Sequence, residues 1–130
     1  FATPGVNLGL FCSTPMVALS RNVNKKNAME MLLTGDFISA EKAKEIGLIN
    51  NAVPKEDLTS EVDRLAEKIA SKSTMTVATG KRAFYAQAEM DLSDAYEYTS
   101  KTMTDNLLKN DAKEGIDAFL EKRSPDWKDE

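Results

Sequence analysis

The spacing of apolar residues in this chain is helical over most of its length. Leu58, Val62, Leu65 and Ile69 lie 4, 3 and 4 positions apart, so they share one face of a helix. Similar patterns predict further helices at residues 14–21, 25–34, 40–46, 75–88, 92–107 and 111–122. Only residues 51–53 are expected to be extended, because a residue before proline avoids the helical region. The chain is therefore predicted to be mostly α with a short β stub, as in the peripheral part of an α/β domain.

Polar residues and glycines mark the ends of several predicted helices. Ser13, Asn24 and Ser39 each stand just before a helical stretch, where a side-chain oxygen can accept from a free N–H of the first turn. Gly35 and Gly47 follow two of these helices, and a glycine in the left-handed conformation commonly ends a helix. These boundaries are predicted from local chemistry alone.

The composition argues against several functional classes. The formal charge is −4, from 17 basic and 21 acidic residues, which does not suit a nucleic-acid-binding protein. There is no histidine, so this chain alone cannot supply a Ser-His-Asp or Cys-His mechanism, and no metal site is expected. Its single cysteine cannot form an internal disulfide. No apolar run approaches the roughly 18 residues that a membrane span requires.

Three stretches of the sequence carry a family resemblance. They are FATPGVNLGL at 1–10, AMEMLLTGDFISA at 28–40 with its continuation to VP at 53–54, and EGIDAFLEKR at 114–123. Together they resemble the crotonase (enoyl-CoA hydratase/isomerase) superfamily over nearly the whole chain. The variants PGVN at 4–7 and GLFCSTP at 9–15 resemble a poorly characterised mitochondrial subgroup of that family. The resemblance therefore implies a mitochondrial location.

The resemblance places a catalytic glutamate of the hydratases directly after Pro4, where this chain has Gly5. A carboxylate that passes protons to or from water cannot be replaced by a hydrogen atom. Gly5 also has a structural interpretation, as a turn glycine that needs a positive φ after proline. In either case no catalytic residue is expected in this chain. The resemblance implies that the wall of the acyl pocket consists of Gly5, Gly9, Leu10, Phe11, Cys12 and Ser13.

Two of these pocket residues have reactive side chains. Cys12 is a candidate nucleophile if a helix N-terminus lowers its pKa, but a small buried apolar residue is the favoured interpretation. Ser13 is a candidate hydrogen-bond donor to a ligand, and helix capping is its favoured interpretation.

Phe119 and Lys122 are three residues apart, so they are expected to project from one face of the last helix. By spacing alone they are a core aromatic and a solvated charge, with Ile116, Phe119 and Leu120 pointing inward. The resemblance instead implies that the ring stacks on the adenine of CoA and that the lysine pairs with its phosphate, across a subunit boundary. Four charged residues nearby are interpreted as ordinary surface charges, namely Lys113, Glu114, Glu121 and Arg123. Trp127 is expected to pack against a neighbouring element.

The resemblance also implies a fold and an assembly. Family members form the ClpP/crotonase spiral of βββα units and assemble as homotrimers or dimers of trimers. Residues 1–54 are then the end of the core, with the pocket-lining loop, and residues 55–130 are the helical trimerisation and CoA-contact region. Because the chain starts at Phe1, inside an apolar stretch without a charged leader, we expect it to be cut from a larger protein. The two N–H donors of the oxyanion hole and a second hydratase carboxylate are expected upstream.

The sequence thus favours acyl-CoA binding or processing in fatty-acid metabolism, without a competent hydratase centre in this chain. No cofactor is expected beyond the CoA thioester itself. Three alternatives remain open: an enzyme that draws its acid/base from the upstream half or from Ser13 and solvent, a non-catalytic acyl-CoA-binding regulator, or an assembly module only.

Overall fold

A computed structural model describes residues 1–129, and in that range the regular structure is entirely helical. The chain forms two compact units, one of residues 1–58 and one from Thr59 onward, here called unit 1 and unit 2. The boundary expected from the sequence was four residues earlier, and the roles assigned to the two parts remain predictions. None of the helices within residues 1–129 is long and apolar enough to cross a bilayer.

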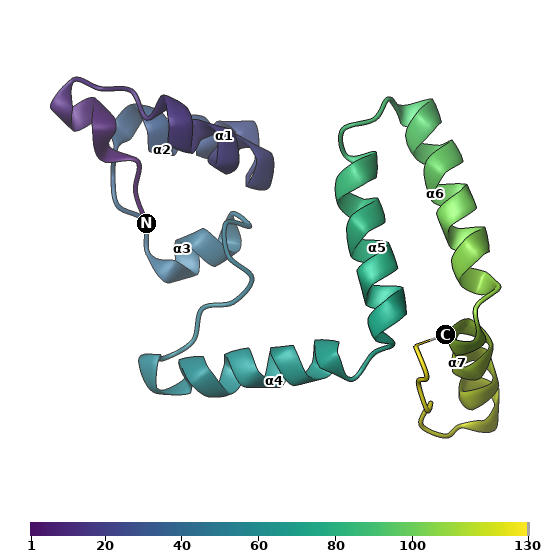
Figure 1. The fold of residues 1–130 in the computed structure, drawn as a ribbon. Helices are drawn as coiled ribbons and strands as arrows, with labels where there is room; N and C mark the ends of the chain where they lie inside the picture. The colour runs from purple at the N-terminus through teal and green to yellow at the C-terminus, as the bar shows by residue number, and fades with distance from the viewer. Residues whose placement is uncertain (130) are drawn as a thin grey trace. The chain divides into compact units, whose positions relative to one another are not determined.

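Unit 1 has short helices around a small apolar core (Figure 1). Its elements in order are η1 (Pro4–Leu8), α1 (Ser13–Asn22), α2 (Lys25–Thr34), α3 (Ala40–Glu45) and η2 (Lys55–Asp57). Helix α2 packs against both α1 and η1. The buried core residues come from α1, α2 and the turn between them, and they are Leu19, Val23, Ala28, Met31 and Leu32.

The N-terminal segment is tied to this core by hydrogen bonds. Phe1 and Ile38 exchange two backbone bonds, of 3.0 and 2.9 Å. The buried Thr3 hydroxyl donates to the Met31 carbonyl at 2.8 Å. The first residues of the chain therefore lie against α2 and set where η1 begins.

Most predicted helix ends in unit 1 are confirmed. Asn24 accepts from the Asn27 N–H at 3.0 Å and Ser39 from the Lys42 N–H at 3.1 Å. Gly35 ends α2 with φ 67°, and Gly47 follows α3 with φ 79°. The prediction that Ser13 is an N-cap is wrong, because Ser13 is already the first residue of the helix. Cys12 is the N-cap, and the Ser13 hydroxyl donates to the Phe11 carbonyl at 3.3 Å.

The predicted β stub is also wrong as a strand. Residues 51–54 have no regular secondary structure, and the structure has no strand anywhere in residues 1–129. Pro54, which follows this segment, has φ −51° and ψ 150°. An extended segment becomes a strand only when a second one lies beside it, and the described chain offers none.

Unit 2 contains the four longer helices, α4 (Leu58–Ala70), α5 (Thr74–Gln87), α6 (Leu92–Leu107) and α7 (Asn110–Glu121). Helices α5 and α6 lie side by side as an antiparallel pair, and α6 also contacts α7 (Figure 1). Ser73 is the N-cap of α5 and accepts a hydrogen bond from the Thr76 N–H at 3.2 Å.

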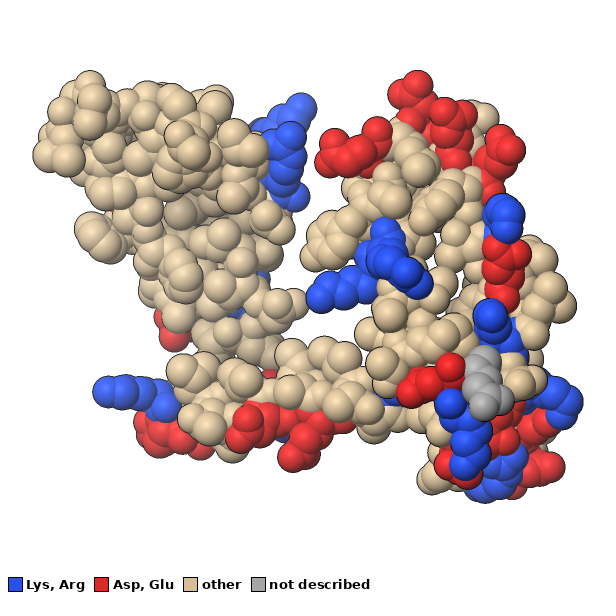
Figure 2. All heavy atoms as spheres, viewed as in Figure 1, with Lys and Arg blue, Asp and Glu red and all other residues tan. Residues whose placement is uncertain are grey.

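The apolar stripes of unit 2 are largely uncovered. Its buried apolar residues are the alanines Ala83, Ala95 and Ala118, where the helices approach closely. The expected inward orientation of Ile116, Phe119 and Leu120 is wrong, because their exposed fractions are 48%, 81% and 71%. Within residues 1–129 these three side chains stay largely open to solvent. The visible face of unit 1 has few charged side chains, whereas acidic and basic residues mix over α7 (Figure 2).

Candidate functional site

The predicted pocket wall lies on η1 and on the loop that leads into α1. A hydrogen bond from the Leu10 N–H to the Gly5 carbonyl, 2.9 Å long, closes this loop. Gly9 caps η1 with φ 73°, a conformation that favours glycine. Leu10 and Phe11 follow with much of their side chains exposed. The segment therefore presents apolar groups outward while its backbone folds back on Gly5.

Gly5 faces the N-terminal end of α1. Its N–H donates to the Cys12 thiol at 3.3 Å. A Cβ atom on Gly5 would lie 2.6 Å from the Leu10 carbonyl oxygen and 2.7 Å from the Cys12 sulfur, closer than such atoms approach in proteins. Gly5 does not have a positive φ, so the turn-glycine interpretation is wrong. The residue is glycine because its surroundings leave no room for any side chain.

Cys12 fills that space. It is partly buried and packs against the apolar core of unit 1. Its sulfur accepts the Gly5 N–H, so the thiol points into the protein rather than toward a ligand. This geometry supports the interpretation of Cys12 as a small packing residue.

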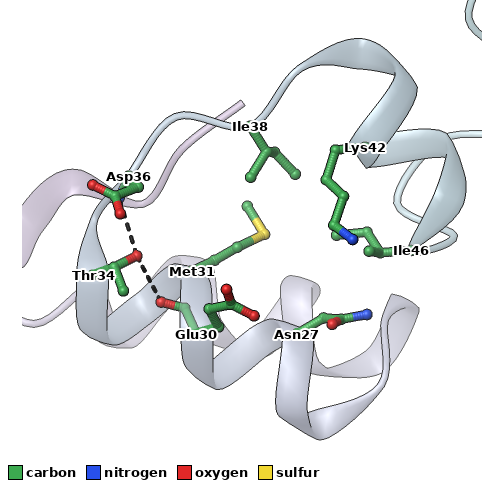
Figure 3. A pocket seen from close by; sticks show the side chains of 8 residues that line it. All are labelled: Asn27, Glu30, Met31, Thr34, Asp36, Ile38, Lys42 and Ile46. Carbon is green, nitrogen blue, oxygen red and sulfur yellow. Dashed lines mark hydrogen bonds between the residues drawn. The ribbon is translucent and has the colours of Figure 1, made fainter.

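Two cavities of unit 1 are lined by residues outside the predicted wall. One of about 580 Å³ lies between the first residues of the chain, α1 and Leu48. The other, of about 70 Å³, lies between α2 and α3 (Figure 3). Met31, Ile38 and Ile46 form its apolar side. The Thr34 hydroxyl donates to the Glu30 carbonyl at 2.8 Å and accepts the Asp36 N–H at 3.2 Å. Sites for organic ligands have about 300–1,000 Å³, so this cavity is too small for an acyl-CoA.

Unit 2 has an apolar groove of about 540 Å³ between α5, α6 and α7. Ile116, Phe119 and Trp127 are among the residues that line it. Phe119 is therefore an exposed ring beside a groove and not a core residue. Lys122, its predicted partner, does not line the groove.

Lys122 lies beyond the end of α7, which corrects the expected helical spacing. The helix ends at Glu121, and Lys122 has φ 56° and ψ 39°, the left-handed conformation. The Arg123 N–H donates to the Ala118 carbonyl at 3.0 Å and the Lys122 N–H to the Phe119 carbonyl at 3.3 Å. These two bonds form a Schellman motif. Phe119 and Lys122 are near each other in the chain but do not share a helical face.

The sequence suggested that Arg123 and Glu114 are independent surface charges, but in the structure they form an ion pair. The guanidinium holds the Glu114 carboxylate with two bonds, Nη1 to Oε1 at 2.6 Å and Nη2 to Oε2 at 2.9 Å. Its Nε also donates to Glu121 Oε2 at 2.6 Å. Arg123 and the Asp126 N–H lower the pKa of Glu114 to about 2. Glu114 and Glu121 in turn raise the pKa of Arg123.

The C-terminal tail, residues 123–129, packs on α7 and the start of α5. The packing of Trp127 was expected, but the hydrogen bonds that hold the tail were not. Asp111, only 2% exposed, accepts the Lys128 and Asp129 N–H groups at 2.8 and 3.1 Å. Trp127 donates from Nε1 to the Ser71 carbonyl at 3.0 Å. Its ring lies against Gly115, where an added Cβ would be 3.2 Å away. A single tryptophan beside a helix with a glycine was the only sequence signal for this contact.

Comparisons with known proteins place these features in a family. The family profile described as enoyl-CoA hydratase/isomerase matches residues 1–130. The chain is 57% identical over 127 residues to the mitochondrial enoyl-CoA hydratase domain-containing protein 3 of Rattus norvegicus, covering 98% of this chain and 42% of that protein. It is 55% identical over 130 residues to the Homo sapiens protein of the same name, covering 100% and 43%. The subgroup predicted from 4–7 and 9–15 is thereby confirmed.

Comparison with solved structures leads to the same family. A crystal structure of an enoyl-CoA hydratase from Mycobacterium smegmatis matches with TM-score 0.91 and 50% identity, over 98% of this chain and 49% of that one. The structure of the human enoyl coenzyme A hydratase domain-containing protein 3 matches with TM-score 0.88 and 55% identity, over 98% and 50%. The chain spans less than half of the length of the curated relatives it matches. The predicted helical portion of the crotonase fold is confirmed.

Proposed function

The chain belongs to the enoyl-CoA hydratase/isomerase family, and from that premise we propose that the full-length natural protein binds and processes acyl-CoA but is not a competent enoyl-CoA hydratase. We place this activity in mitochondrial fatty-acid metabolism, as the names of its relatives suggest.

The environment of Gly5 carries this proposal. Hydration needs a positioned carboxylate to move protons to and from water. At Gly5 even a methyl group would overlap the Leu10 carbonyl and the Cys12 thiol. The position that the hydratases give to a glutamate is here closed by backbone and sulfur.

The acyl group is proposed to lie along the outward face of the segment with Gly5, Gly9, Leu10, Phe11, Cys12 and Ser13. Support comes from the exposed apolar side chains of Leu10 and Phe11. CoA is proposed to contact Phe119, whose ring is exposed, and Lys122, with no cofactor besides the CoA thioester.

We also propose that the protein assembles as a homotrimer or a dimer of trimers. The exposed apolar stripes of α4 and α7 support assembly, because apolar area of this kind is normally covered in a stable protein.

The test uses the full-length natural protein and crotonyl-CoA. Its hydration rate is expected to lie about 10²- to 10⁴-fold below that of a family hydratase that carries the glutamate. Gly5→Glu is expected not to restore the rate, because the loop at 10–12 blocks the new side chain. Sedimentation velocity on the same sample is expected to show three or six chains.

Three results have distinct meanings. Normal hydratase turnover by the parent protein contradicts the proposal. Binding of acyl-CoA without turnover of any thioester favours the non-catalytic regulator. A sample that binds no CoA leaves only the role of an assembly module.

A further inference from the structure

The conformation of Lys122 is unusual for its residue type. Glycine adopts the left-handed conformation at the other helix ends of this kind, Gly9 after η1 and Gly35 after α2. Helix α7 ends in the same way with a lysine, at φ 56°. A side chain at this position disfavours the left-handed conformation, so a glycine would end α7 at lower cost. A strained residue of this kind persists when surrounding contacts hold it and often serves a function.

The contacts that hold Lys122 come from the residue after it. Arg123 grips Glu114, two turns back along α7, with the two parallel bonds described above. Glu114 Oε1 also accepts the Asp126 N–H at 2.8 Å, which ties the tail to the same carboxylate. A bidentate pair fixes orientation as well as distance. The chain on the C-terminal side of Lys122 is therefore held against α7.

The ion pairs around this helix leave Lys122 available. Lys113 pairs with Asp117 and Lys128 with Asp126, while Arg123 engages both Glu114 and Glu121. Among residues 110–129, Lys122 is the one basic residue without an acidic partner. Its acidic sequence neighbour, Glu121, is occupied by Arg123. The ammonium is thus free to meet an anion from outside the chain.

We propose that Glu114 and Arg123 form a clamp of positioning residues, which holds Lys122 in its left-handed conformation so that its ammonium meets a phosphate of CoA. This inference rests on the proposed CoA contact of Lys122 and deepens it. The clamp touches no ligand and acts only through the backbone at Lys122.

The experiment is a double-mutant cycle in the full-length natural protein, with CoA affinity measured by calorimetry. The variants are Lys122→Ala, Glu114→Gln and the two combined. Asp117→Asn is the matched control, since it removes the same charge from an exposed pair on the same helix. Thermal unfolding of each variant checks that it folds.

Lys122→Ala is expected to weaken CoA binding about 5- to 30-fold, the range for one charge-assisted contact. Glu114→Gln is expected to weaken it about 3- to 10-fold, as for a coupled neighbour, and to have no further effect when Lys122 is already alanine. Arg123→Lys keeps the positive charge but cannot form two parallel hydrogen bonds to Glu114, so it should weaken CoA binding as much as Glu114→Gln does. Asp117→Asn should bind as the parent does.

The melting temperature of a glycine variant tests whether the backbone at Lys122 is strained. Lys122→Gly is expected to raise the melting temperature and to weaken CoA binding as much as Lys122→Ala, because glycine relieves the strain and removes the ammonium.

Other outcomes overturn the clamp. If Glu114→Gln has no effect, or weakens binding equally with and without Lys122, the clamp does not act through Lys122, while the proposed CoA contact stands. If Lys122→Ala binds CoA as the parent does, both the CoA contact and the clamp are wrong.

Discussion

Units 1 and 2 are held together in different ways. Unit 1 buries large apolar side chains such as Leu19, Met31 and Leu32 in a contiguous core. Unit 2 buries mainly alanines between its helices and fastens its tail with the buried carboxylate of Asp111. Its large apolar side chains point outward. Both units leave other large apolar side chains exposed, such as Phe37 in unit 1 and Phe119 in unit 2, but within residues 1–129 only unit 1 buries large ones in a core of its own.

This difference also separates the two candidate sites. In unit 1 the place of a catalytic group is closed by packing, at Gly5 and Cys12. In unit 2 the candidate CoA contacts are exposed, and ion pairs set their geometry. The proposed chemistry on unit 1 is thus limited by space, whereas the proposed CoA recognition on unit 2 depends on charge.

The largest expected effect contrasts one leucine from each unit. Leu32 is 2% exposed, so Leu32→Ala should cost about 2–5 kcal/mol of the unfolding free energy of unit 1. Leu65 on α4 is 43% exposed, and Leu65→Ala in the 130-residue chain should change stability by about 0.5 kcal/mol or less. Native-state hydrogen exchange measures the two units separately. Equal losses at both positions would remove the contrast between the units.

A smaller effect is expected at the glycines. Gly5→Ala should destabilise unit 1 by about 1–3 kcal/mol, because the added methyl group overlaps its neighbours. Gly80 lies within α5, and a Cβ there meets nothing within 4 Å. Gly80→Ala should therefore stabilise unit 2 by about 0.5–1 kcal/mol. Thermal unfolding followed by circular dichroism measures both, and a neutral Gly5→Ala would show that the loop at 10–12 yields easily.

The smallest expected effect is the loss of stability at low pH, when Glu114 becomes protonated. The pKa of Glu114 is about 2 in the folded chain against an ordinary 4.5. Its contribution to stability is therefore complete above about pH 4.5 and is lost as the pH falls toward 2. The emission of Trp127, the only tryptophan, should shift as the tail loosens over that range.

Other carboxylates also hold the tail, so the contribution of Glu114 is the difference between the parent chain and Glu114→Gln. Asp105→Asn, which breaks an exposed pair on α6, serves as the control and should titrate as the parent does. Identical acid curves for the parent and Glu114→Gln would show that the Arg123 pair does not hold the tail.

Local signals predicted much of the fold. Asn24, Ser39 and Gly35 act through bonds to residues three or four positions away, so the sequence around them was sufficient. The stripe on α7 shows which face is apolar but not whether the same chain covers it, and Phe119 was wrongly expected to point inward. A strand likewise depends on a second strand beside it, and within residues 1–129 no strand forms at 51–53.

The candidate sites depended on contacts that spacing does not reveal. Glu114 and Arg123 are nine positions apart and meet because α7 ends at Glu121 and the chain turns back. The reason for Gly5 was missed in the same way, since its constraint comes from Leu10 and Cys12 and not from its own φ. The absence of a carboxylate was visible in the sequence, while the cause of that absence required the structure.

The contact between Gly5 and Cys12 bears on how this branch of the family can evolve. A reversion to glutamate at position 5 meets the Leu10 carbonyl and the Cys12 sulfur at once. Replacing the cysteine by a smaller residue removes only one of these obstacles, because the carbonyl belongs to the backbone. Each single step on the way back is expected to lower stability before any activity returns. On the proposed function, a glutamate at position 5 is therefore not regained by a single substitution, and selection would favour uses of the proposed thioester site that need no carboxylate there.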